Sequence, residues 1–236
     1  MATAFVPNHL GDISPDEAML VAIRWLRQQG KPHCVLAAGV RIIEYSEPLR
    51  RLVRRDEITT LRSASRSMLS RAAAVLGCWP SADDLAELHR VATAGTAVCV
   101  VRWVDTVEER VWINSTGAMN LLTGQVGDDR YPVAVDPVVQ VAMRSLSASV
   151  NLSGWHPMDE NRIKWVLLNA PREGHPYDPD HLFEWVLTEQ LFPWYQAAKL
   201  RKLAAQVCEG RSLRIRYGTH YVDDIFDKWR READGI

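Results

Sequence analysis

Arginine side chains gather in one segment of the chain, at spacings that suit the binding of phosphate. Residues 48–71 hold seven arginines and two acids, net +5, in a chain of 236 residues whose formal net charge is -1. The guanidinium group is planar, always charged and offers a fork of donors that matches phosphate oxygens. Contacts of this kind are electrostatic and independent of base sequence, so the segment predicts a surface that binds nucleic acid.

A helix over this segment would sort its side chains by polarity. At 100° per residue, one arc carries the basic side chains of Arg50, Arg51, Arg54 and Arg55. Leu49, Leu52 and Val53 fall on the opposite arc. Arg62 and Arg66 are one turn apart and continue the basic side, so we expect an arginine-rich helix with one buried face.

Residues 199–216 form a second basic segment, with six cations against one acid, net +5. Residues 211–217 (RSLRIRY) alternate in polarity, which predicts a strand with Arg214 and Arg216 on its exposed face. If this strand lies beside the arginine-rich helix, the two form one basic groove. The predicted nucleic-acid-binding residues are therefore Arg50, Arg51, Arg54, Arg55, Arg62, Arg66, Arg214 and Arg216.

The same charges also fit two roles that involve no nucleic acid. The arginines can form a solvated face that pairs with acids elsewhere, since the chain outside residues 48–71 carries net -6. Residues 104–136 hold six acids and two arginines, net -4, so opposed basic and acidic regions also fit oriented docking onto a protein. The corresponding alternative function is a protein-only inhibitor or immunity-type binding protein.

A histidine–carboxylate cluster offers a different chemistry. His175, Asp178 and His181 lie close in sequence, and imidazole with carboxylate can hold a metal ion that activates water. A metal-dependent hydrolase or nuclease is therefore a further alternative. However, the spacing matches no ligand signature such as HExxH, no GxSxG, P-loop or GxGxxG motif is present, and Asp178 can instead cap the following helix. The main prediction includes no catalytic residue, no metal and no cofactor.

The elements that position these residues form an α+β pattern, with six or seven helices around a mixed sheet. Helices are predicted over residues 15–29, 48–76, 82–93, 137–148, 222–231 and 178–207, the last broken at Pro193. Strands are predicted over residues 33–38, 40–45, 163–169 and 211–217. Period-two runs further predict a β-hairpin over about 96–114. We expect a single domain over residues 1–236, with a sub-boundary near residue 95 as the alternative: a helix-rich 1–95 and an α+β 96–236.

Composition limits the classes of protein that the chain can represent. Its 47% hydrophobic and 24% charged residues are typical of a folded chain and exclude both extensive disorder and a polycation. No basic signal-peptide start, no run of about 18 apolar residues and no CxxC pair occurs. We therefore predict a cytoplasmic protein without membrane contact: a non-catalytic accessory or regulatory subunit that contacts nucleic acid and a protein partner within a larger assembly.

Overall fold

The computed structural model describes most of the chain. The described residues are 2–7, 13–37, 40–55, 59–61, 69–102, 105–128, 133–216, 221 and 224–235. The chain divides into two compact units, unit 1 over residues 1–130 and unit 2 over residues 131–236. Residue 95, the alternative boundary from the sequence, lies inside unit 1, in the turn between a helix and a strand.

Unit 1 is built on a parallel sheet. Its elements are β1 (Thr3–Val6), α1 (Pro15–Arg27), β2 (His33–Ala37), α2 (Val40–Tyr45), α3 (Glu47–Arg55), β3 (Thr59–Leu61), β4 (Ala74–Cys78), α5 (Ala82–Thr93), β5 (Ala97–Val101), α6 (Val107–Thr116) and β6 (Met119–Asn120). Within the described residues the sheet has six strands in the order β3-β2-β4-β5-β1-β6, and every strand pairing is parallel. The chain as a whole thus mixes helices with strands, as the predicted α+β class requires.

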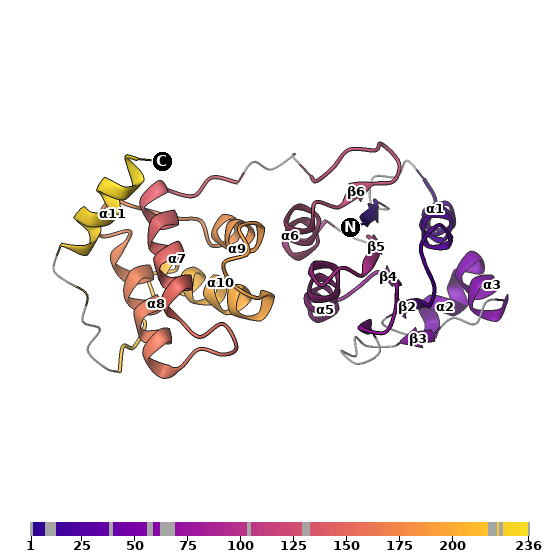
Figure 1. The fold of residues 1–236 in the computed structure, drawn as a ribbon, viewed down its shortest axis with the longest axis horizontal. Helices are drawn as coiled ribbons and strands as arrows, with labels where there is room; N and C mark the ends of the chain where they lie inside the picture. Colours follow the sequence, from indigo (N-terminus) through magenta and orange to yellow (C-terminus); the bar gives the residue numbers. More distant parts are fainter. Residues whose placement is uncertain are drawn as a thin grey trace. The chain divides into compact units, whose positions relative to one another are not determined.

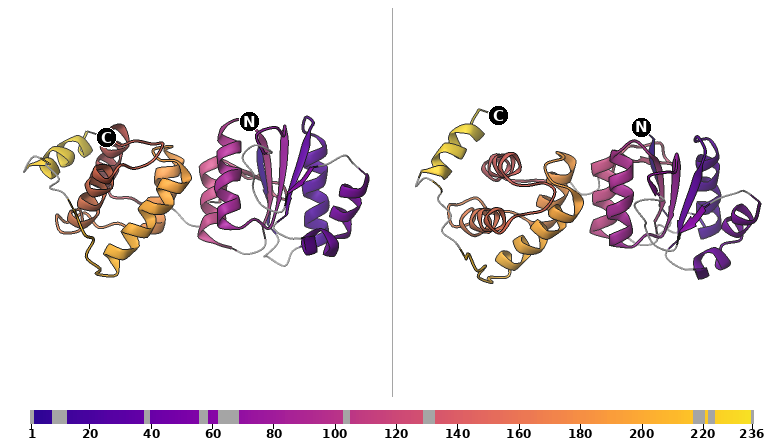
Figure 2. Two further views of the ribbon diagram at one scale, coloured as in Figure 1. Left: turned by 90° about the horizontal axis from the view of Figure 1, so that it is seen from below. Right: turned by 60° about the horizontal axis from the view of Figure 1, so that its bottom comes forward.

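Helices cover both faces of this sheet (Figures 1 and 2). α1 packs against β1, β4, β5 and α3, whereas α5 packs against β5 and α6, and α6 packs against β1. The connections after β1 and β2 run toward the β3 edge, and those after β4 and β5 run toward the β6 edge. Right-handed crossovers in opposite directions place their helices on opposite faces, so α1 to α3 cover one face and α5 and α6 the other.

α1 illustrates how local sequence fixes an element. Ser14 is its N-cap and accepts a hydrogen bond from the backbone N–H of Glu17 at 3.2 Å, while the Glu17 carboxylate accepts from the N–H of Ser14 at 2.8 Å. This capping box satisfies two backbone donors that the helix itself cannot pair. The apolar face of α1 then buries Met19, Ile23 and Leu26 against the sheet.

The central strands of unit 1 are buried on both faces. All five residues of β4 are buried, as expected for a parallel strand with a helix layer on either side. Gly77 lies within β4, at a point where Leu88 of α5 packs closely against the strand. A Cβ atom at Gly77 would lie 2.7 Å from Cδ1 of Leu88, so a larger residue would require the Leu88 side chain to shift.

The predicted hairpin over residues 96–114 is wrong. Its first half is β5, which pairs in parallel with β4 and β1, and its second half is the helix α6. Thr106 caps α6 by accepting from the N–H of Glu109 at 3.2 Å, and Gly117 ends it in the left-handed conformation at φ 61°. These local signals outweigh the β-forming tendency of the ERVWIN run between them.

Unit 2 is helical throughout its regular elements. It contains α7 (Pro137–Ser149), α8 (Pro157–Asn169), α9 (Pro179–Thr188), α10 (Trp194–Cys208) and α11 (Ile225–Ala233). α7 packs against α8 and α11, and α10 packs against α8 and α9. The predicted break at Pro193 is confirmed, since α9 ends before this residue and Pro193 is the N-cap position of α10.

Several other predicted elements change type. The predicted strands over 40–45 and 163–169 are parts of the helices α2 and α8, and residues 211–216 have no regular secondary structure. The predicted helix over 48–76 is divided into α3, β3 and β4. As a result, the described residues contain ten helices rather than six or seven. Short apolar runs fit a buried helix face as well as a strand, and only tertiary packing separates the two.

Candidate functional site

The arginine-rich helix exists as α3, and its two faces differ as predicted. Leu49 and Leu52 are buried, and the helix packs against α1. Arg51 and Arg54 are exposed on the other side. Arg55 closes the helix with a side chain outside the described atoms, and Arg62 and Arg66 lie outside the described residues.

Glu47 partly offsets the charge of this helix. Its carboxylate accepts a hydrogen bond from Nε of Arg51 at 2.7 Å and also forms an ion pair with Arg50. The three side chains are 39% to 67% exposed, and ion pairs this exposed to water contribute little free energy. α3 carries four arginines against this one acid, net +3, and each guanidinium has more donors than Glu47 uses.

Arg214 and Arg216 belong to unit 2. Both side chains are exposed. Leu213, which directly precedes Arg214, is buried. The backbone N–H of Arg216 donates to Oδ1 of Asn161 on α8 at 3.3 Å, which ties this segment to the helix. Because α3 lies in unit 1, the single basic groove predicted from sequence stays a prediction.

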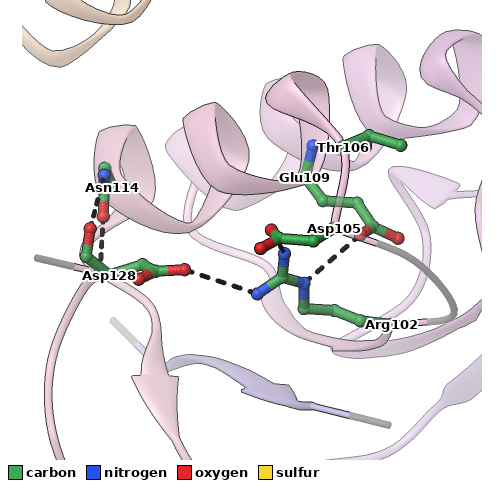
Figure 3. Close-up of polar contacts among 6 residues, drawn as sticks. All are labelled: Arg102, Asp105, Thr106, Glu109, Asn114 and Asp128. Carbon is green, nitrogen blue, oxygen red and sulfur yellow. Dashed lines mark hydrogen bonds and ion pairs between the residues drawn. The ribbon is translucent and has the colours of Figure 1, made fainter. Parts of the chain in front are cut away.

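Arg102, which nothing in the sequence singled out, is the centre of a buried polar cluster at the carboxyl end of β5 (Figure 3). Its side chain is 1% exposed and forms ion pairs with Asp105, with Glu109 at 3.3 Å and with Asp128 at 3.5 Å. Asn114 holds Asp128 in turn: its Oδ1 accepts from the Asp128 N–H at 2.6 Å, and its Nδ2 donates to the Asp128 carbonyl at 3.2 Å.

This cluster changes the meaning of the acidic region noted in the sequence. Asp105, Glu109 and Asp128 face the buried Arg102, so half of the six acids in residues 104–136 lie against an internal cation. Arg102 is also held by its backbone, since its N–H donates to the carbonyl of Val6 at 3.1 Å. The cluster therefore joins the ends of β5 and β1 to α6 and to the segment around residue 128.

The histidine–carboxylate cluster does not converge on a metal site. Nδ1 of His175 lies 3.2 Å from the carboxylate of Asp136, and its Nε2 accepts from Nε of Arg230 at 3.1 Å. Asp178 is the N-cap of α9 and accepts from the N–H groups of Asp180 and His181, which confirms the capping interpretation. In the part of the chain that the structure describes, no three His, Cys, Asp or Glu residues are placed to hold a metal ion.

A pocket of about 530 Å³ opens at the carboxyl edge of the unit 1 sheet. It is lined by Pro15, Asp16, Arg41, Ile42, Tyr45, Ser46 and Trp79. Trp79 directly follows β4 and adopts a left-handed backbone at φ 51°, which is uncommon for a tryptophan. The pocket lies where β2 and β4 are neighbours but lead to helices on opposite faces, and open α/β sheets bind ligands in crevices of this kind.

Comparison with known proteins adds one family. Residues 135–230, which contain α7 to α10 and most of α11, match the family described as "Domain of unknown function (DUF1889)". The match covers less than half of the chain. No curated protein and no solved structure matches the chain. Across the described residues, no helix has both the length and the apolar character needed to cross a membrane.

Proposed function

We propose that the protein is a non-catalytic accessory or regulatory subunit that binds nucleic acid phosphates through exposed arginines, within a larger assembly. The observation that carries the proposal is the polarity of α3, which buries leucines and exposes Arg51 and Arg54. α3 carries four arginines against one acid, which is a net charge of +3 on a helix of nine residues. Guanidinium groups that neutralise phosphates release condensed counterions, and this release drives binding.

The exposed cations of residues 211–216 support the same role from unit 2. Arg214 and Arg216 offer donors to solvent, and Arg211 is 69% exposed while paired with Glu209 at 3.0 Å. Exposed cations on both units fit contact with a long polyanion. It also fits the proposed protein partner, whose acidic side chains would present similar oxygens.

The test is the salt dependence of binding to labelled single-stranded and duplex DNA, measured by fluorescence anisotropy from 50 to 200 mM salt. We expect affinity to fall steeply with salt, and the double variant Arg51→Glu/Arg54→Glu to weaken binding at least tenfold and to reduce the salt slope by about two. The matched control is Lys228→Glu/Arg231→Glu, which makes the same charge change on exposed cations of α11. Salt-independent binding, or an equal loss in the control, would contradict the proposal and favour a protein-only role.

A second candidate function rests on the pocket at the carboxyl edge of the sheet. Its apolar and aromatic wall, with Arg41 and Asp16 as charged groups, fits a small molecule that combines a flat ring with a polar group. Tyr45→Ala would test this role, because Tyr45 is 81% exposed at the pocket and its loss should not disturb the core. Thermal-shift screening that finds a ligand for the wild type and an equal response in Tyr45→Ala would exclude this pocket as the binding site.

A further inference from the structure

Unit 2 contains a pocket of about 300 Å³ beside the first turns of α8. Its lining residues are Trp155, Pro157, Glu160, Asn161, Lys164 and Arg216. The four that belong to α8 recur at helical spacing, so one face of the helix forms one wall. Arg216 brings the basic segment 211–216 to the same pocket, although Arg216 lies 55 residues after Asn161 in the chain.

Two buried donors in the pocket lining have no acceptor among the residues that the structure describes. Asn161 is only 3% exposed, and its Oδ1 accepts from the N–H of Arg216, but its Nδ2 finds no acceptor among the described residues. The indole Nε1 of Trp155 is likewise buried without an acceptor there. Buried donors in folded proteins are almost always paired, so two orphans in the lining of one pocket point to an oxygen-bearing ligand that would supply the acceptors.

The charge around the pocket selects an anion. Glu160 accepts from Lys164 at 2.6 Å and from Lys199 at 2.5 Å, and these two hydrogen bonds lower the pKa of its carboxyl group. Lys199 also lies 5.1 Å from the centroid of the Trp155 ring. Lys164 and Lys199 thus pair with Glu160, and Arg216 adds a further, exposed cation to the pocket lining, so these four side chains carry net +2.

The helix N-terminus alone would not justify a site. Asp159 accepts from the N–H groups of His156 and Asn151, and the His156 ring accepts from the N–H of Met158 in the first turn of α8. The donors that remain are side chains, namely Asn161, Trp155, Lys164 and Arg216. The evidence for a ligand is therefore the position of these four side chains in the lining of one pocket.

We infer that this pocket binds the phosphate group of a nucleotide, with Arg216, Lys164 and the Asn161 amide as donors. This inference names a ligand for the proposed function. It rests on that function in one respect: the pocket chemistry fits any phosphate ester, and the proposed nucleic acid binding selects a nucleotide. The pocket is larger than a phosphate group alone requires and has an indole in its wall, which leaves room for part of the nucleoside. The same chemistry can come from a free mononucleotide or from the phosphorylated end of a strand.

Calorimetric titration with four probes tests this inference: AMP, adenosine, a 5′-phosphorylated oligonucleotide and the same oligonucleotide with a 5′-hydroxyl. We expect AMP to bind and adenosine not to bind. Arg216→Gln should weaken AMP binding at least tenfold, whereas Arg211→Gln, in the same segment but outside the pocket lining, should leave it unchanged. Tighter binding of the 5′-phosphorylated strand than of AMP identifies the strand end as the source, and the reverse identifies a free nucleotide.

Two results would overturn the inference. One is equal binding of AMP and adenosine, or no binding of either; the other is equal AMP affinity in Arg216→Gln and Arg211→Gln. Because Arg216 is exposed, its variant should remain folded, which circular dichroism would verify. Arg51→Glu/Arg54→Glu, which alters unit 1 alone, should leave AMP binding intact while it weakens DNA binding. Failure of the pocket is therefore distinguishable from failure of the proposed function.

Discussion

Arg102 and Arg216 show two opposite uses of an arginine in this chain. Arg102 is 1% exposed in unit 1 and is surrounded by three carboxylates, whereas Arg216 is exposed in unit 2 and lines a pocket with a single acid. Arg102 thus has three carboxylate partners within the described part of the chain. The pocket at Arg216 has more cations than acids, and two donors in its lining lack acceptors among the described residues.

This difference in the balance of acids and cations distinguishes a structural polar network, at Arg102, from a binding surface, at Arg216. A buried ion that is fully paired fixes the segments that carry its partners, and it leaves little for a ligand to satisfy. A cluster of side chains with more hydrogen-bond donors than acceptors is destabilised by the unsatisfied donors. A ligand that supplies the missing acceptors removes this free-energy cost. The sequence places Arg216 in a basic segment and Arg102 beside an acidic one, but it does not show which carboxylates reach each guanidinium group.

The largest effect that follows from this comparison concerns Arg102. Arg102→Met would leave Asp105, Glu109 and Asp128 clustered without their shared cation, and we expect the free energy of unfolding to fall by about 3–5 kcal/mol. Urea unfolding followed by circular dichroism measures the loss. The control is Arg90→Met, which breaks an ion pair with Glu87 at a side chain 38% exposed and should cost less than about 1 kcal/mol. Equal losses would remove the distinction between the two uses of arginine.

His89 gives a second way to test the interior of unit 1. Burial in α5 lowers the pKa of His89 to about 4. The unfolded chain takes up this proton as the pH falls through about 6.5, whereas the folded protein takes it up only near pH 4, so stability falls progressively as the pH drops through this window. The loss is at most about 3 kcal/mol.

His89→Leu removes this contribution to the pH dependence. We expect the free energy of unfolding of the variant to fall less than that of the wild type between pH 7 and pH 4, as measured by urea titration at each pH. Parallel curves for the two proteins would show that burial of His89 contributes nothing to acid sensitivity.

A smaller effect is expected at Asn161, where the comparison predicts tolerance instead of damage. Asn161→Leu removes the hydrogen bond to the Arg216 N–H but also removes a buried donor that has no acceptor among the described residues. These contributions oppose each other, so the free energy of unfolding should change by less than about 1 kcal/mol, while AMP binding is lost. A stability loss near that of Arg102→Met would instead make Asn161 a structural residue and contradict the ligand assignment.

The parts of the fold that could be predicted are those fixed by neighbouring residues. The predicted helix starts at residues 15, 82 and 178 agree closely with the structure, in which Ser14, Ser81 and Asp178 are the N-caps, because a cap acts on amides two or three positions away. α6 was missed although Thr106 and Gly117 carried the same kind of signal. The ERVWIN run between these two residues is rich in β-forming residues, and nothing within the run itself reveals its packing against α5.

The candidate sites divide along the same line. The polarity of α3 was predicted because it depends only on helical periodicity. Arg102 and Asn161 were not, because Asp128 lies 26 residues from Arg102 and Arg216 lies 55 residues from Asn161. Whether a charged or amide side chain is satisfied depends on such distant partners, which only the folded chain brings together.

The smallest effect concerns Glu47, the one acid on the arginine face of α3. Glu47→Gln breaks its exposed ion pairs with Arg50 and Arg51 and removes a favourable charge from the first turn, so we expect a stability loss of about 0.5 kcal/mol. The net charge of α3 rises from +3 to +4, which should tighten DNA binding severalfold at 50 mM salt and have little effect at 200 mM. Glu232→Gln, the same charge change beside Lys228 on α11, is the control and should leave binding unchanged. Weaker DNA binding by Glu47→Gln would mean that Glu47 orients the arginines instead of competing with phosphate. The arginines of α3 would then resemble Arg102, which is held by its carboxylate partners, more than the exposed Arg216.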